Sequence, residues 1–185
     1  NTQAAQAKVT EQYDLNQTEG LAQARRGLIA APQGQVRDAE GEVVWDFDSF
    51  AFIQGEAPTT VNPSLWRQAT LNNINGLFKV TDRVYQVRGY DLANMTLVIG
   101  PQGWVVVDPL TAVESAAAGM DLVRKTLGDL PITGIVFTHS HGDHYGGVAA
   151  LASPEVLASG KIPIVAPHGF TDEAISENVI AGIYM

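Results

Sequence analysis

The sequence predicts an α/β fold in which helices pack on a central sheet. Apolar runs with strand character recur between residues 80 and 138, and a segment with helical spacing at 111–127 divides them into two groups. Helix and strand patterns continue in alternation to about residue 180. Such alternation is typical of domains in which amphipathic helices cover a hydrophobic sheet. We therefore expect one α/β domain preceded by an N-terminal arm.

The arm occupies residues 1–75 in this prediction. From Asn1 to about Gly34 the chain is rich in Ala, Gln and Thr, and its widely spaced leucines permit a helix or an extended segment. The stretch 43–52 mixes aromatic and acidic residues in near alternation. This pattern predicts a short strand or an ordered segment held by Trp45, Phe47 and Phe50.

A helix is expected at the end of the arm. Ser64 follows Pro63 and can cap a helix that runs to about Asn73. Gly76, just beyond it, is a typical stop signal. The α/β domain is then predicted to span residues 76–185.

Three strands are predicted next. Residues 80–88 alternate apolar and polar side chains, and 95–100 and 104–108 are apolar runs. Gly89 and the turn at 101–103 separate them, and such short connections favour antiparallel pairing. We expect an antiparallel set of strands in this part of the sheet.

The segment 111–127 is predicted to be an amphipathic helix. Thr111 and Glu114 have the spacing of a capping box, and Gly128 follows the last apolar position. Residues 132–138 have the pattern of a buried strand. Beyond that strand we expect a short helix at 148–151, a strand at 162–166 and a helix from Thr171 to about Ile180.

Composition excludes several classes of function. Eleven Lys and Arg against twenty Asp and Glu give a net charge of −9, which opposes binding to a phosphate backbone, so no nucleic-acid partner is expected. The chain has no Cys, which excludes disulfides, thiolate metal sites and thiol nucleophiles. Its apolar runs are far shorter than the roughly 20 residues of a membrane span, so we expect no transmembrane segment.

The clearest chemical signal is the segment 139–144, His-Ser-His-Gly-Asp-His, directly after a buried strand. Open α/β sheets usually bind ligands at the carboxyl ends of their strands. Residues two apart in an extended chain point the same way, so His139 and His141 can offer imidazoles to one metal ion. The glycine that follows permits a sharp turn, which can direct Asp143 and His144 to a second ion.

These ligand types predict a binuclear metal centre. Imidazole and carboxylate suit Zn²⁺, although Fe and Mn are compatible with the same ligands. Two adjacent ions can hold a bridging hydroxide and polarise the group under attack, which supports hydrolysis without a side-chain nucleophile. A polar turn whose imidazoles only form hydrogen bonds is the weaker interpretation of three His and one Asp at these offsets. Asp143 is predicted to act both as a ligand and as the general base.

The hexapeptide resembles the His-x-His-x-Asp-His pattern of the metallo-β-lactamase superfamily. The surrounding sequence is similar to the alkylsulfatases of that superfamily, and the similarity covers most of the chain from about residue 40. The similar segments are 45–47, 84–96, 103–111, 138–148, 166–170 and 175–179. The resemblance implies the first half of an αββα sandwich with an N-terminal wrapping arm.

By this resemblance the protein would be a two-zinc alkylsulfatase that releases an alcohol and inorganic sulfate from alkyl sulfate esters such as dodecyl sulfate. His139 and His141 would bind one Zn²⁺, and Asp143 with His144 the other. Family members are typically bacterial homodimers that are periplasmic or secreted, and the start at Asn1 is compatible with a removed leader. The remaining ligands, two Glu and a His, and the dimerisation domain would lie beyond Met185, so we expect an N-terminal part of such an enzyme.

Some polar residues near the cluster have two interpretations. Asp108 ends a strand, where it can orient the metal-binding imidazoles or simply form a turn. His168 is interpreted as a loop residue rather than a ligand. Glu177 and Asn178 are interpreted as residues that cap a helix or bond a neighbouring loop.

Arg88, Asp91 and Asn94 fall in a predicted loop between two strands. They either border the substrate cleft or serve packing and turns. If one of them binds sulfate, Arg88 is the choice, because its guanidinium offers a planar fork of donors.

Two other functions remain open. Another hydrolase with the same fold, such as a thioesterase, lactonase or phosphodiesterase, could use the same ligands, and only the flanking sequences argue against it. A non-catalytic fragment that binds metal weakly and associates with a partner chain is the second alternative.

Overall fold

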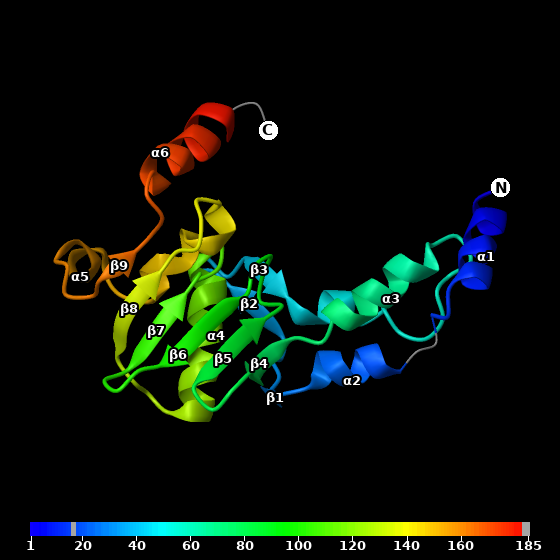
Figure 1. Ribbon diagram of the computed structural model, residues 1–185, viewed down its shortest axis with the longest axis horizontal. Coiled ribbons are helices and arrows are strands. Elements are labelled where there is room, and N and C mark those ends of the chain that lie inside the picture. Colours follow the sequence, from blue (N-terminus) through cyan, green and yellow to red (C-terminus); the bar gives the residue numbers. More distant parts are fainter. Residues whose placement is uncertain (16–17, 183–185) are drawn as a thin grey trace.

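A computed structural model describes residues 1–15 and 18–182. A seven-stranded sheet in the order β1-β4-β5-β6-β7-β8-β9 forms its centre, and helix α4 packs against one face of that sheet (Figure 1). Helices α1, α2 and α3 extend away from the sheet on one side, and α6 projects from one of its edges. In the described part of the chain, no helix is long and apolar enough to cross a membrane.

The strands pair antiparallel from β1 to β7 and parallel from β7 to β9. Their bounds are β1 Leu28–Ala30, β4 Gly76–Lys79, β5 Val84–Arg88, β6 Met95–Ile99, β7 Trp104–Val107, β8 Ile132–Val136 and β9 Ile164–Val165. The predicted antiparallel set is therefore confirmed. The change to parallel pairing follows from the connection between β7 and β8, because a parallel pair needs a crossover and α4 provides it.

The strand predicted at 80–88 is shorter than expected, and an unpredicted strand precedes it. Residues 80–83 form a hairpin turn, in which the Val80 amide donates to the Val84 carbonyl at 2.9 Å. The alternation of apolar and polar residues continues through this turn, so the sequence predicted one strand where the structure has a turn followed by β5. Gly76 lies past the preceding helix, as expected, and begins β4.

The core lies between α4 (Val113–Leu127) and the sheet. Alternate side chains of β5 and β6, such as Val87 and Met95, are fully buried on this face, together with Met120 and Val123 of α4. A Cβ at Gly119 would lie 3.1 Å from the Met95 side chain and 3.2 Å from Val87, so glycine allows the close approach of helix and sheet.

The predicted capping box of α4 is wrong. The N-cap is Ala112, which offers no side-chain acceptor, and the amides of Thr111 and Ala112, which precede the helix, donate to Asp91 from the loop between β5 and β6. Asp91 Oδ2 accepts from the Thr111 amide at 2.9 Å and from the Ser115 hydroxyl at 2.6 Å. A carboxylate distant in sequence thus holds the segment that leads into α4, a contact that local residue spacing does not record.

The N-terminal arm contains α1 (Thr2–Gln12), α2 (Glu19–Arg25), the hairpin of β2 (Gln35–Arg37) with β3 (Val43–Asp46), the 3₁₀ helix η1 (Phe47–Phe50) and α3 (Pro63–Asn72). The arm also contributes β1, which pairs with β4 at the edge of the sheet. Ser64 is not the cap of α3, contrary to expectation. Asn62 caps this helix by accepting from the Ser64 and Leu65 amides, because Pro63 lacks an N–H and already fits the first helical position.

The elements after β8 are short. They are the 3₁₀ helices η2 (Gly142–His144) and η3 (Gly146–Ala150), then α5 (Pro154–Ala158), α6 (Phe170–Ile175) and the π-helix η4 (Ser176–Ala181). The predicted helix at 148–151 corresponds to η3, and the helix predicted from Thr171 corresponds to α6 with η4. Helix α5, which begins at a Ser-Pro pair, was not predicted.

Candidate metal centre

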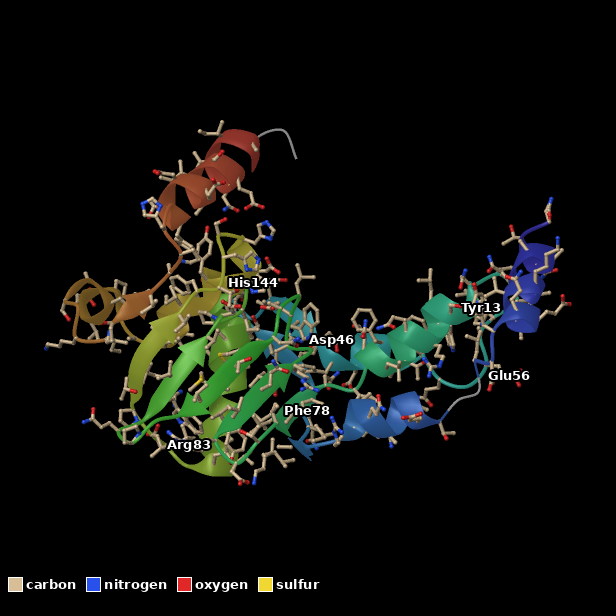
Figure 2. All side chains as sticks on the ribbon, viewed as in Figure 1. Tyr13, Asp46, Glu56, Phe78, Arg83 and His144 are labelled. Carbon is tan, nitrogen blue, oxygen red and sulfur yellow. The ribbon has the colours of Figure 1, made fainter. Side chains whose placement is uncertain are left out.

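The candidate ligands lie in the loop that follows β8, at the end of the sheet where the carboxyl ends of β7 and β8 meet. Parallel pairing of these strands brings Asp108, just after β7, beside the residues just after β8. Figure 2 shows His144 at this end of the strands and Arg83 at the opposite end. The predicted location at the carboxyl ends of the strands is therefore observed.

The loop brings the four predicted ligands together around His139. The ring centroids of His139 and His141 are 4.6 Å apart, and those of His139 and His144 are 4.1 Å apart. The Oδ2 atom of Asp143 lies 3.3 Å from Nε2 of His144. The side chain of His141 is 58% exposed, whereas those of Asp143 and His144 are 30% and 23% exposed.

Asp108 is buried beneath this loop and accepts three hydrogen bonds from it. Its Oδ1 atom accepts from the Thr138 amide at 2.8 Å. Its Oδ2 atom accepts from the Thr138 hydroxyl at 2.6 Å and lies 2.9 Å from Nδ1 of His144. An ionised carboxylate can only accept, so His144 donates from Nδ1 to Asp108. In the neutral imidazole this leaves the lone pair on Nε2, which is the atom that would bind a metal.

The same carboxylate orients His139 through Thr138. The Thr138 hydroxyl has a single proton, which it donates to Asp108, and it lies 2.9 Å from Nδ1 of His139. His139 must therefore donate from Nδ1 to the hydroxyl oxygen, which leaves Nε2 as the free donor to a metal. Of the two interpretations of Asp108, the geometry matches the one in which it orients imidazoles.

The backbone around Asp108 adopts left-handed conformations that non-glycine residues rarely occupy. Asp108 has φ 54° and Leu110 has φ 67°. The Gly147 amide donates to the Leu110 carbonyl at 2.9 Å, and a Cβ at Gly147 would lie 2.2 Å from the Pro109 carbonyl oxygen. Strained backbone of this kind persists where the surrounding structure over-determines it, as it often does at functional sites.

The donor set fits a divalent metal in chemistry and orientation but does not by itself complete a site. In His139 and His144 the Nδ1 atom already has a hydrogen-bond partner, so Nε2 is the atom available to a metal. His141 and Asp143 lie beside them. Such ligands suit Zn²⁺. Within residues 1–15 and 18–182, no three His, Asp or Glu side chains already converge as a set that could hold an ion. The four residues could therefore supply only part of a coordination shell.

Helix α6 and the π-helix η4 pack against the loop from the other side. Phe170 at the start of α6 stacks on Phe137 with ring centroids 5.4 Å apart and meets the edge of Tyr145 at 5.3 Å. The Asn178 side-chain amide donates to the Tyr145 hydroxyl at 3.1 Å, and Oε1 of Glu177 lies 3.5 Å from Nε2 of His141. The bond from Asn178 to a neighbouring loop matches its predicted role, whereas the approach of Glu177 to His141 was not predicted.

The other residues singled out in the sequence lie outside this cluster. Asp91 bonds the segment that leads into α4, and His168 is exposed in the loop before α6. Arg88 stacks on the Phe78 ring, with its Cζ atom 4.3 Å from the ring centroid, and burial lowers the pKa of its guanidinium. Arg88, Asp91 and Asn94 line a cavity of about 580 Å³ together with aromatic side chains of β3 and η1.

Comparison with known proteins confirms the predicted fold class and the resemblance. Residues 88–183, just over half of the chain, match the metallo-beta-lactamase superfamily. An (R)-specific secondary-alkylsulfatase and a linear primary-alkylsulfatase, both from Pseudomonas sp, are 45% and 43% identical over 185 and 187 aligned residues, which cover 100% of this chain. The chain spans 28% of the length of each of these relatives.

A solved structure agrees with these sequence matches. The stereoselective inverting sec-alkylsulfatase from Pseudomonas sp superposes with a TM-score of 0.94 at 46% identity. The superposition covers 98% of this chain and 29% of that chain. At this identity and overlap, the elements that hold the loop after β8 share one arrangement in both proteins.

Proposed function

Because this chain belongs to the metallo-β-lactamase superfamily, we propose that the protein in which it occurs hydrolyses alkyl sulfate esters to an alcohol and inorganic sulfate. The observation that carries this proposal is the 43–45% identity to two alkylsulfatases along the entire chain, with the candidate ligands grouped at one edge of the sheet. The other hydrolases of this fold share the ligand types, so the surrounding sequence is what favours sulfate esters.

We propose that the site holds two zinc ions, one bound by His139 and His141 and the other by Asp143 and His144. Bound zinc would supply Lewis-acid activation of water and of the ester group. The residues of this chain have separate tasks. Asp108 and Thr138 hold the Nε2 atoms of His144 and His139 toward the site, through the hydrogen bonds of 2.9 Å to their Nδ1 atoms.

Asp143 is proposed as both ligand and general base. Its carboxylate lies at the turn after His141 with its side chain 30% exposed, so water can reach it. Oδ2 stands 3.3 Å from Nε2 of His144, so the proposed base lies directly beside the nitrogen that is proposed to bind the same ion. A carboxylate in this position can accept the proton that water loses as it attacks the ester.

The test is sulfate release by the natural protein that contains this sequence. Dodecyl sulfate and 2-octyl sulfate serve as primary and secondary esters, with a thioester and a lactone as competing substrates. Zinc-dependent release of sulfate without thioester or lactone hydrolysis is the expected result. Turnover of only the thioester or lactone would replace the proposal with another hydrolase. Reaction in ¹⁸O-labelled water then shows the bond that breaks, because label in the alcohol means attack at carbon and label in sulfate means attack at sulfur.

A further inference from the structure

We propose that Glu177 is the positioning residue for His141. In each of the three imidazoles in the loop after β8, the ring nitrogen that does not face the metal site would then be held by a neighbouring side chain. This inference rests on the metal centre of the proposed function. His139 and His144 have Thr138 and Asp108 as partners at 2.9 Å. His141 has a carboxylate from another element, with Oε1 of Glu177 at 3.5 Å from Nε2.

As a consequence, the three imidazoles do not all direct the same ring nitrogen toward the metal site. Metal-binding His residues usually donate their second ring N–H to a carboxylate, a carbonyl or water, and this partner determines the tautomer. Asp108 and Thr138 hold Nδ1 of their two imidazoles, so His144 and His139 present Nε2. Glu177 faces Nε2 of His141, so His141 presents Nδ1.

The fold places Glu177 by packing that is independent of His141. Phe170 contacts both Phe137 and Tyr145, whose rings also contact each other, and this three-ring cluster holds the start of α6 to the end of β8. The bond from Asn178 to the Tyr145 hydroxyl, at 3.1 Å, holds the next helical segment to the same loop. Figure 1 shows α6 projecting at this edge of the sheet. The loop and η4 are thus attached on both sides of the Glu177 contact.

Asn178, the neighbour of Glu177 in η4, also lies near the loop at Gly142. A Cβ added to Gly142 would lie 3.5 Å from Oδ1 of Asn178, an ordinary van der Waals distance, which places this part of η4 next to the residue that follows His141. The Glu177 and His141 side chains are 37% and 58% exposed. Because both are partly solvated, we expect Glu177 to act on orientation with a modest effect rather than to supply a large electrostatic energy.

The test compares Glu177→Ala and Glu177→Gln with Glu173→Gln, a control that changes an exposed carboxylate one turn earlier, within α6. The first measurement is NMR of zinc-free protein labelled with ¹⁵N in histidine, at a pH where the imidazoles are neutral. We expect His141 to carry its proton on Nε2, and His139 and His144 on Nδ1. Glu177→Ala should shift His141 toward a mixture of tautomers and leave the other two unchanged, whereas the control should change none. A proton on Nδ1 of His141, or no response to Glu177→Ala, would overturn the proposal.

The second measurement is zinc affinity by chelator competition, without substrate. Glu177→Ala should weaken binding by roughly tenfold, the lower end of the range for residues that orient ligands. Glu177→Gln, which keeps a carbonyl oxygen as acceptor, should lose less, and the control should stay within about twofold. Unchanged affinity in Glu177→Ala refutes the positioning role. Absence of zinc binding in the unmodified protein refutes the metal centre itself, while normal zinc binding without sulfate release refutes only the proposed substrate.

Discussion

The Oδ2 atom of Asp108 lies 2.9 Å from Nδ1 of His144, although 36 positions separate the two residues in the sequence. The same atom accepts the Thr138 hydroxyl at 2.6 Å, and that hydroxyl reaches Nδ1 of His139. One buried carboxylate thus orients two of the three imidazoles of the candidate centre. Because the parallel pairing of β7 with β8 creates this arrangement, the site depends on strand topology as much as on the ligand sequence.

Replacing Asp108 should weaken metal binding without removing a ligand. Asp108→Asn keeps the shape, and Asn tolerates the left-handed backbone at φ 54°. The amide cannot accept from all three donors as a carboxylate does, so the imidazoles lose their fixed orientation. We expect zinc affinity to fall about 10–100-fold in a chelator competition assay. Asp121→Asn, which changes an exposed carboxylate on α4, is the control, and equal affinities in the two variants would contradict the role of Asp108.

Removal of the Thr138 hydroxyl should lower stability. Thr138→Val preserves the branched shape but takes away the group that bonds both Asp108 and His139. Loss of a hydrogen bond to a charged partner should reduce the free energy of unfolding by about 1.5–3 kcal/mol, measured with urea. Thr138→Ser retains the hydroxyl and should restore most of that loss. A serine variant as unstable as the valine variant would mean that the methyl group, not the hydroxyl, matters.

The contacts that Asp91 makes at the start of α4 should contribute measurably to stability. Asp91→Ala removes the acceptor for the Thr111 amide and the buried Ser115 hydroxyl, so we expect the free energy of unfolding to fall by about 1–2 kcal/mol. Glu114→Ala is the matched control, because Glu114 was predicted to cap the helix. It should change stability by at most about 0.5 kcal/mol. A larger loss from Glu114→Ala than from Asp91→Ala would mean that the local residue, not Asp91, stabilises the start of the helix.

Tyr90 should make stability depend on pH in the alkaline range. Its side chain is 3% exposed and packs against Phe47, and burial raises the pKa of its phenol from 10.0 to about 12. The unfolded chain ionises Tyr90 near pH 10, whereas the folded protein resists until about pH 12. The contribution to stability is therefore full below pH 10 and is lost as pH rises through 12, with a total on the order of 2 kcal/mol.

Comparison with Tyr90→Phe isolates this effect. The variant keeps the ring that meets Phe47 at 4.8 Å but cannot ionise. Urea unfolding at intervals from pH 8 to about 12 should show the wild type losing stability relative to the variant only above pH 10. A difference between the two proteins that stays constant with pH would mean that Tyr90 ionises equally easily in the folded and unfolded states.

Loss of the proposed base should reduce turnover more than metal content. Asp143→Asn removes the proton acceptor while leaving an oxygen that can still approach a metal, so sulfate release from dodecyl sulfate should fall by about 10²-fold or more. Zinc content, measured on the same samples by elemental analysis, separates a lost base from a lost ion. Asp172→Asn, an exposed acidic residue of α6, is the control. Near-normal turnover in zinc-loaded Asp143→Asn would refute the role of Asp143 as base.

The sequence by itself determined the fold class, the antiparallel part of the sheet and the location of the candidate ligands. These features depend on local patterns: alternation in strands, helical spacing in 111–127, and four candidate ligands in one short loop after β8. Each is read from neighbours along the chain, so no knowledge of distant contacts is needed. The errors also have local causes, since the turn at 80–83 continued a strand pattern and Pro63 displaced the expected cap of α3.

Only the tertiary structure decided which partners orient those ligands. Asp108 reaches His144 through the pairing of β7 with β8, Asp91 bonds the start of α4 from another loop, and Glu177 reaches His141 because aromatic packing holds α6 to the end of β8. A hydrogen bond between residues far apart in sequence depends on the packing of whole elements, and composition or spacing does not record that packing. The ligands are thus a property of one short segment, whereas their orientation is a property of the fold.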